Sequence, residues 1–209
     1  PMLVAQVLNL LYSIVDRVYI GRIPGAGTEA LGAVGLCFPV IILVTGFTNM
    51  FGLGGAPLFS MALGQGNREK AIDIQNTALR LLILVGAAIL LVGELLGDRI
   101  LLLFGATTGE LSLALPYLRI YLIGTIFIMV STGMNAYINA QGFPVIGMIS
   151  VTIGAASNLI LDPLFIFGWK LGVSGAAVAT VLSQLLSFLF VLSFLFGKKN
   201  ELPVCFAWS

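Results

Sequence analysis

The chain contains no histidine and few charged residues, and both shortages exclude classes of function. The absence of histidine among its 209 residues excludes histidine-dependent catalytic triads, imidazole proton relays and most zinc sites. The two cysteines, Cys37 in an apolar run and Cys205 near the end, form neither a disulfide framework nor a metal-ligand spacing. A net charge of +1 without a basic tract gives no footprint for nucleic acid.

The shortage of charge also excludes a water-soluble globule. Only 9% of the residues are charged, against about 25% in ordinary soluble domains, and charged side chains cover much of a soluble exterior. The hydrophobic residues make up 59% of the chain and the mean hydropathy is +1.09. Lipid is therefore the expected solvent for most of the surface.

Six apolar segments, separated by short polar or Gly/Pro-rich connections, predict an all-α integral membrane protein. A membrane-spanning helix takes about 20 residues, and short connections make successive helices antiparallel. We therefore expect a six-transmembrane-helix antiparallel bundle over residues 1–199, with a cytoplasmic tail or truncation remnant at 200–209. The expected helices are residues 1–20, 31–63, 71–96, 111–140, 145–167 and 173–196.

The distribution of Lys and Arg near the helix ends predicts the orientation. Positive residues favour the cytoplasmic side of a membrane protein. The ends of the second, fourth and sixth segments carry five, and the other ends carry three, so the N-terminus is predicted to be cytoplasmic in a multi-pass cell-membrane protein. The five are Arg68, Lys70, Arg80, Lys198 and Lys199, and the three are Arg22, Arg99 and Lys170.

Two acidic residues lie inside the predicted membrane spans. Asp16 precedes the expected helix exit at Gly21, and Asp162 precedes the exit at Gly168. A carboxylate at the bilayer centre costs about 2.5–3.5 kcal/mol even on the most lenient scale. At 1.5 Å per residue, both acids lie roughly 7–9 Å below the outer boundary, so we expect them at one level.

Other polar side chains are expected at the same depth. Asn158 lies one helical turn before Asp162, and Thr180 and Tyr117 fall at nearly this level on their own helices. Two carboxylates in a low dielectric require either a retained proton or a cation between them, and hard oxygen ligands suit Na⁺ or a proton. The alternative is local: Asp16 pairs with a neighbouring arginine, Arg17 or Arg22, and Asp162 caps a kinked helix.

Prolines interrupt several of the expected helices. Pro39 and Pro57 lie in the second segment, Pro116 opens the fourth, and Pro163 lies inside the fifth, where it leaves the carbonyl of Leu159 without its helical donor. Broken helices at membrane depth are tolerated where they line a cavity. A simple kink is the alternative at each proline.

Several motifs together resemble the bacterial multidrug and toxic compound extrusion (MATE) transporters, and the DinF-like branch most closely. The motifs are V-D-R-V-Y-I-G-R at 15–22, G-A-V-G-L-C-F-P-V at 32–40, L-G-Q-G-N-R-E-K-A at 63–71, N-A-Q-G-F-P at 139–144, N-L-I-L-D-P-L-F-I-F-G at 158–168 and G-x-x-G-A-A-V-A-T-V at 172–181. The resemblance implies two six-helix lobes around a cleft and an antiporter that exports cationic or amphipathic drugs against inward flow of Na⁺ or H⁺.

The resemblance also assigns residues to an ion-coupling site. The family's acid on the first helix matches Asp16, its Asn and Asp on the fifth match Asn158 and Asp162, and its Thr on the sixth matches Thr180. These four would hold Na⁺ or a proton as the coupling ion, with no other cofactor. Supporting or substrate-lining candidates are Tyr12, Tyr117, Asn135 and Pro163.

The resemblance covers only the first of the family's two lobes. The missing partner is then a second six-helix lobe or a second copy of the chain, unless the product is a non-functional fragment. A lipid-linked sugar flippase of the same superfamily is another alternative; its anionic substrate calls for a basic cleft, for which only Arg17 and Arg119 are candidates. An intramembrane aspartyl protease is excluded because its Tyr-Asp and Gly-x-Gly-Asp signatures are absent, so no enzyme activity is predicted.

Overall fold

The computed structural model describes residues 2–23, 27–197 and 202, and for residues 2–6, 8, 9 and 12 it describes the backbone alone. No strand occurs among the described residues, which confirms the all-α class. The helices are α1 (Met2–Gly21), α2 (Gly27–Gly64), α3 (Arg68–Leu103), α4 (Thr108–Ile123), α5 (Thr125–Ala140), α6 (Pro144–Pro163) and α7 (Gly172–Leu195), and a π-helical turn, η1 (Leu164–Gly168), continues α6.

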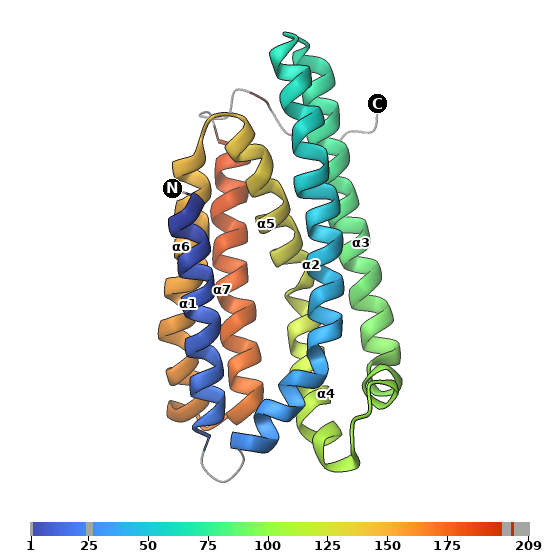
Figure 1. Ribbon diagram of the computed structural model, residues 1–209, viewed down its shortest axis with the longest axis vertical. Helices are drawn as coiled ribbons and strands as arrows, with labels where there is room; N and C mark the ends of the chain where they lie inside the picture. The colour runs from blue at the N-terminus through green and yellow to red at the C-terminus, as the bar shows by residue number, and fades with distance from the viewer. Residues whose placement is uncertain (1, 24–26, 198–201, 203–209) are drawn as a thin grey trace.

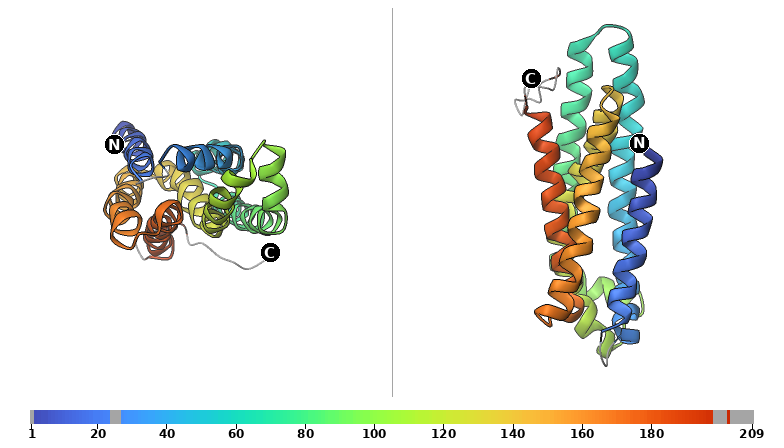
Figure 2. Two further views of the ribbon diagram at one scale, coloured as in Figure 1. Left: turned by 90° about the horizontal axis from the view of Figure 1, so that it is seen from below. Right: turned by 90° about the vertical axis from the view of Figure 1, so that its left-hand side faces the viewer.

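The helices run up and down in a single bundle. Helices α1, α6 and α7 lie together on one side, α2 and α3 pair on the other, and α4 and α5 lie between the two groups (Figures 1 and 2). The α2–α3 and α5–α6 connections lie at one end of the bundle, and the α3–α4 and α6–α7 connections lie at the opposite end. This alternation confirms the predicted antiparallel bundle.

Most of the helices have the length and composition of membrane spans. Four helical segments, α2, α3, α6 with its π turn, and α7, are long and apolar enough to cross a membrane, and the bent pair α4–α5 gives a fifth. Helix α1 packs along α6 and has a similar length. The chain is therefore a multi-pass membrane protein.

The fourth predicted span, 111–140, is not one continuous helix. Helices α4 and α5 meet at Gly124 and are bent by 50°. Gly124 packs closely against α7: a Cβ at this position would lie 2.9 Å from Cγ2 of Val181 and would overlap the amide oxygen of Gln184. Glycine thus lets the chain turn while its backbone stays against α7.

Other boundaries also differ from the sequence expectation: α2 begins at Gly27 instead of residue 31, and α3 begins at Arg68 instead of residue 71. Helix α3 continues to Leu103, through a segment expected to be a connection from residue 97 onward. Helix α4 begins at Thr108, because Thr107 and Glu110 form a reciprocal capping box there. Pro116 therefore lies inside α4 and does not open it.

Helices α2 and α3 form a hairpin much longer than a bilayer is thick. They contain 38 and 36 residues, which corresponds to about 57 and 54 Å at 1.5 Å per residue, whereas the hydrocarbon core is about 30 Å thick. Their connected ends project beyond the ends of α1, α5 and α6 (Figures 1 and 2). The hairpin is therefore longer than the hydrocarbon core is thick, and its connected end extends past the neighbouring helices on that side.

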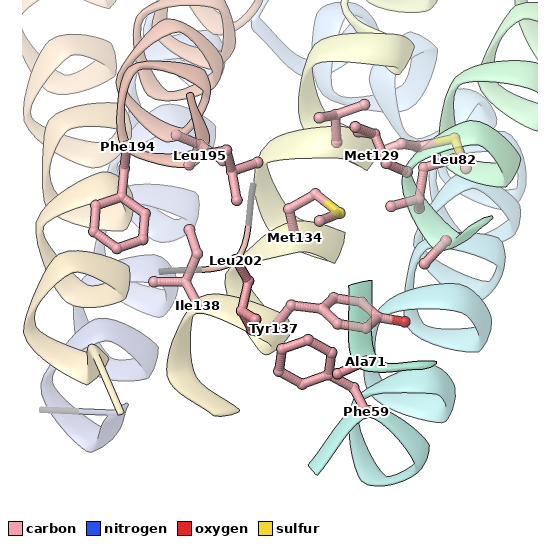
Figure 3. Packing of buried hydrophobic residues seen from close by; sticks show 14 of the residues in the cluster. Phe59, Ala71, Leu82, Met129, Met134, Tyr137, Ile138, Phe194, Leu195 and Leu202 are labelled. Atoms are coloured by element: carbon pink, nitrogen blue, oxygen red, sulfur yellow. The ribbon is translucent and has the colours of Figure 1, made fainter. Parts of the chain in front are cut away.

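Two apolar clusters hold the helices together, one near each end of the bundle. In the cluster of Figure 3, the Tyr137 ring of α5 packs edge-on against Phe59 of α2, with their centroids 5.4 Å apart. The Tyr137 hydroxyl donates a hydrogen bond of 2.7 Å to the Phe51 carbonyl of α2. Leu202, the described residue of the predicted tail, is 4% exposed and belongs to this cluster; the rest of 200–209 lies outside the described residues.

Candidate functional site

The packing of α1 against α6 places the two intramembrane acids side by side. The carboxyl groups of Asp16 and Asp162 lie within hydrogen-bonding reach of each other. Asp162 is 1% exposed, and Asp16 is half-buried. The shared depth expected from the sequence thus corresponds to direct proximity in the structure.

Asn158 links this acid pair to α7. Its Nδ2 donates to Oδ1 of Asp162 at 3.2 Å, across one helical turn, and to the hydroxyl of Thr180 at 3.4 Å. Asn158 is itself 3% exposed. The four residues proposed for ion coupling therefore lie in one cluster formed by α1, α6 and α7, in which Asn158 and Asp162 are buried and Asp16 and Thr180 are partly buried.

The cluster contains oxygen atoms that have no hydrogen-bond donor. Oδ1 of Asp16, Oδ1 of Asn158 and Oδ2 of Asp162 are buried and accept no hydrogen bond from any described residue. A buried acceptor without a donor is costly. Carboxylate and amide oxygens are the ligands of hard cations, and a carboxyl pair can share a proton. These oxygen ligands therefore suit Na⁺ or H⁺ chemically.

The alternative of separate local pairings is supported only by proximity, because the charge of Arg17 lies close enough to act on the Asp16 carboxyl. In the described part of the chain, no ion pair joins Asp16 to Arg17 or Arg22, and the guanidinium of Arg17 lies instead over the ring of Phe38. The carboxyl of Asp162 is engaged by the Asn158 side chain and faces Asp16. Pro163 ends α6, and the π turn η1 follows it.

The other predicted site residues differ in their position relative to this cluster. Tyr117 of α4 is 4% exposed, lines the same cavity as Asp16, and stacks on Tyr121 with their centroids 6.3 Å apart. Asn135 of α5 also lines the cavity, but it bonds α6: its Nδ2 donates to the Gly147 carbonyl and the Ser150 hydroxyl, at 3.0 Å each. Tyr12 lies on α1, and its side chain is outside the described residues.

The cluster opens into a cavity of about 320 Å³ between the helices. Hydroxyl and amide groups from several helices line it. The lining groups that the sequence reasoning missed are Ser13, Thr45, Thr48, Ser131, Thr132, Ser150, Ser183, Gln184 and Ser187. On α7, Thr180, Ser183, Gln184 and Ser187 follow the spacing i, i+3, i+4, i+7 of one helix face, so this polar face could have been found from the sequence.

The charges in the C-terminal part of α3 are separate from this cavity. Glu94 of α3 lies 3.8 Å from Arg119 of α4, and both side chains are exposed. Neither residue lines the cavity. Of the two arginines within the spans, Arg17 alone therefore faces the candidate site.

A membrane bundle with hydroxyl and amide groups along an internal cavity, and with two adjacent carboxyls beside it, is typical of the class of membrane transporters. The MatE family model matches residues 1–164. The chain therefore belongs to the MatE family, which confirms the resemblance in its motifs.

Named relatives and solved structures agree with this assignment. The chain is 28% identical over 204 residues to the multidrug export protein MepA of Staphylococcus aureus (strain MRSA252), a match that covers 98% of this chain and 45% of MepA. It is similar to a crystal structure of MATE in complex with MaD3S, with a TM-score of 0.91 and 28% identity. This match covers 98% of the present chain and 45% of the chain in that structure. It is also similar to the outward-facing conformation of a multidrug resistance MATE family transporter, with a TM-score of 0.91, 27% identity and coverage of 100% and 47%.

The chain spans less than half the length of these relatives. The matched portion corresponds in fold to a single helical bundle, which is consistent with one lobe.

Proposed function

We propose that the chain is one half of a secondary antiporter that exports cationic or amphipathic drugs against inward flow of Na⁺ or H⁺. The observation that carries the proposal is the cluster of Asp16, Asn158, Asp162 and Thr180, whose carboxyl and amide oxygens include three without a donor among the described residues. A cation or a proton satisfies these oxygens. The resemblance to proteins named for multidrug export supports the transport direction.

Coupling follows from the position of the cluster between three helices. An ion that binds one arrangement of α1, α6 and α7 more tightly than another shifts the bundle toward that arrangement. A substrate that binds the other arrangement more tightly then opposes the ion. Binding of either ligand lowers the affinity of the protein for the other by the same factor. The cavity beside the acid pair gives substrate access to the same helices.

The proposal includes a second lobe and an orientation. A six-helix second lobe, or a second copy of this chain, completes a central cleft, in keeping with the coverage of about 45% of each relative. The bias of Lys and Arg toward the ends of the second, fourth and sixth predicted segments supports a cytoplasmic N-terminus in the cell membrane.

A flippase for lipid-linked sugars fits the cavity less well. A diphosphate needs several cationic partners, and in the described chain Arg17 is the only Lys or Arg that lines the cavity. The second candidate arginine, Arg119, is exposed beside Glu94. The lining favours a substrate with at most one negative group.

Transport into vesicles tests the proposal. The chain is reconstituted in its assembled form, as a dimer or together with the second lobe, a Na⁺ gradient and a pH gradient are imposed separately, and movement of a fluorescent organic cation is followed. We expect one gradient to drive movement. Asp16→Asn and Asp162→Asn should abolish it, whereas Asp98→Asn, at an exposed acid of α3, should not.

Wild-type rates in both Asn variants at the acid pair would refute the coupling site. Sedimentation of the purified chain tests whether a second copy completes the cleft. A dimer supports a cleft formed by two copies, and a strict monomer requires a separate second lobe.

A further inference from the structure

A groove between α2 and α3 lies apart from the ion-coupling cluster. Its volume is about 430 Å³, and it shares no lining residue with the cavity beside the acid pair. The lining side chains follow one face of each helix. From α3 they include Lys70, Asp73, Thr77 and Leu81, and from α2 they include Gly54 and Leu58. The groove therefore follows the hairpin along its length.

The groove is charged at one end and apolar over most of the rest. Lys70 and Asp73 lie in the first two turns of α3, which begins at Arg68 beside the hairpin connection. They are the charged members of the described lining, and the groove continues from them to Leu81. Lys70 and Leu81 are separated by about 16 Å along the helix axis at 1.5 Å per residue. These dimensions and this polarity suit an amphipathic molecule with a charged head and an apolar tail.

The two charges at this end have no partner within the described chain. The side chains of Lys70 and Asp73 are exposed, and neither forms an ion pair or a side-chain hydrogen bond with residues 2–23, 27–197 or 202. Residues three positions apart on a helix have Cβ atoms about 5–6 Å apart on the same face. Lys70 and Asp73 together can thus bind a ligand that carries one negative and one positive group close together.

Exposed apolar side chains on α2 continue up to the level of these charges. Leu58 and Met61 are 53% and 56% exposed, although both lie within about two turns of the end of α2 at Gly64. Apolar side chains that remain this exposed mark a surface that contacts membrane or protein. Lipid at this surface places its acyl chains beside Leu58 and its headgroup beside Lys70 and Asp73.

The floor of the groove is open and has no polar group that needs a partner. Gly54 is exposed, and a Cβ at this position would meet no heavy atom closer than 4.0 Å. Tyr137 of α5 also lines the groove, but its hydroxyl already donates to the Phe51 carbonyl. The floor thus offers apolar contact to a hydrocarbon chain and requires no hydrogen bond from it.

We propose that this groove binds a phospholipid with an ethanolamine headgroup. The Lys70 ammonium donates to the lipid phosphate, the lipid ammonium donates to the Asp73 carboxylate, and one acyl chain lies over Gly54 toward Leu81. A choline headgroup has no N–H to donate to Asp73, and a glycerol headgroup has no positive charge. The lipid site does not depend on the direction of transport or on the coupling ion.

Competition between phospholipids tests the groove. The chain in its assembled form, as a dimer or together with the second lobe, is purified in detergent. Equal amounts of phosphatidylethanolamine, phosphatidylcholine and phosphatidylglycerol with identical acyl chains are added, and bound lipid is counted by native mass spectrometry. Wild type should retain the ethanolamine lipid about three- to fivefold more than either competitor, the upper range for an exposed ion pair.

Variants at the charged end assign the headgroup contacts. Asp73→Asn should remove the preference for ethanolamine over choline, because the amide has no charge to attract the lipid ammonium. Lys70→Gln should lower retention of all three lipids, because each carries the phosphate. Asp98→Asn and Lys170→Gln, at exposed residues outside the groove, are the matched controls and should change neither quantity.

A variant at the floor tests the acyl-chain contact. Gly54→Leu fills the groove without a steric clash, because the position is open, and should lower retention of all three lipids. Gly46→Leu places the same side chain at another exposed glycine of α2, which also has no neighbour within 4 Å, and should leave retention unchanged. Thermal unfolding of both variants verifies that the helices still pack.

Several results would overturn the lipid site. Equal retention of the three lipids by wild type excludes it without any variant. An ethanolamine preference that persists in both Asp73→Asn and Gly54→Leu places the lipid elsewhere on the protein. A photo-crosslinking side chain at Thr77, an exposed residue of the groove, should capture lipid. Capture of the second lobe or of a second copy would show that protein covers the groove.

Discussion

Replacing Asp162 with asparagine removes one of two adjacent carboxyls while keeping the shape of the side chain. Asp162 is 1% exposed, and its carboxyl lies beside that of Asp16. Without a cation, two such carboxyls either repel each other or retain a proton at a cost. The uncharged amide removes both the charge repulsion and the cost of retaining a proton. We therefore expect Asp162→Asn to be more stable than wild type in cation-free buffer and to respond less to Na⁺.

The size of both effects follows from the geometry. Two unit charges about 4 Å apart at an effective dielectric of about 20 repel by about 4 kcal/mol, which is the upper limit of the gain without cation. A cation at 100 times its dissociation constant stabilises wild type by about 2.7 kcal/mol. Loss of a charged partner costs about 1.5–3 kcal/mol of binding. At the same Na⁺ concentration, the variant should gain only about 0.3–1.3 kcal/mol.

Thermal unfolding in detergent measures both quantities. Na⁺ replaces choline at constant ionic strength, and a parallel series varies pH to test the proton as the coupling ion. Asp98→Asn serves as the control because Asp98 is an exposed acid outside the cavity. A variant that is less stable than wild type without cation, and that keeps the full response to Na⁺ or pH, would refute the paired-carboxyl interpretation.

Three further substitutions test the architecture by thermal unfolding. Thr107→Ala removes the capping box of α4 and should cost about 1 kcal/mol; an unchanged midpoint contradicts this. In Gly52→Ala the new Cβ would lie 2.8 Å from the Cα of Gly133, so a loss of about 1–3 kcal/mol is expected, whereas Gly46→Ala, with nothing within 4 Å, should be neutral. Tyr137→Phe removes the 2.7 Å bond to α2 and should cost about 1 kcal/mol, and no change would show that the bond contributes nothing.

The helical architecture could be predicted because lipid imposes a simple pattern. Apolar runs of sufficient length, ended by polar clusters, located each span, and the short connections fixed the alternation. The break at Gly124 could not be predicted, because glycine within an apolar run is equally compatible with a continuous packed helix. The extension of α3 past Asp98 and Arg99 was missed because charged residues at a helix end resemble a connection when only composition is considered.

The candidate site could be predicted in part. The depths of Asp16 and Asp162 could be computed from their distance to a helix exit, and those depths correctly suggested proximity. Depth alone does not show which helices adjoin, so the bond from Asn158 to Thr180 required the packing of α6 on α7. The contact of Arg17 with Phe38 lies between α1 and α2, and no sequence spacing encodes it.

The hairpin of α2 and α3 projects far beyond the other helices, so its tip moves the most when the lobe tilts. A small tilt of the bundle displaces the tip of this hairpin more than it displaces the packed helices, because the tip projects past them. A spectroscopic label at Gln65, an exposed residue in the connection between the two helices, would therefore report any ion-dependent tilt of the bundle that the proposed antiport requires.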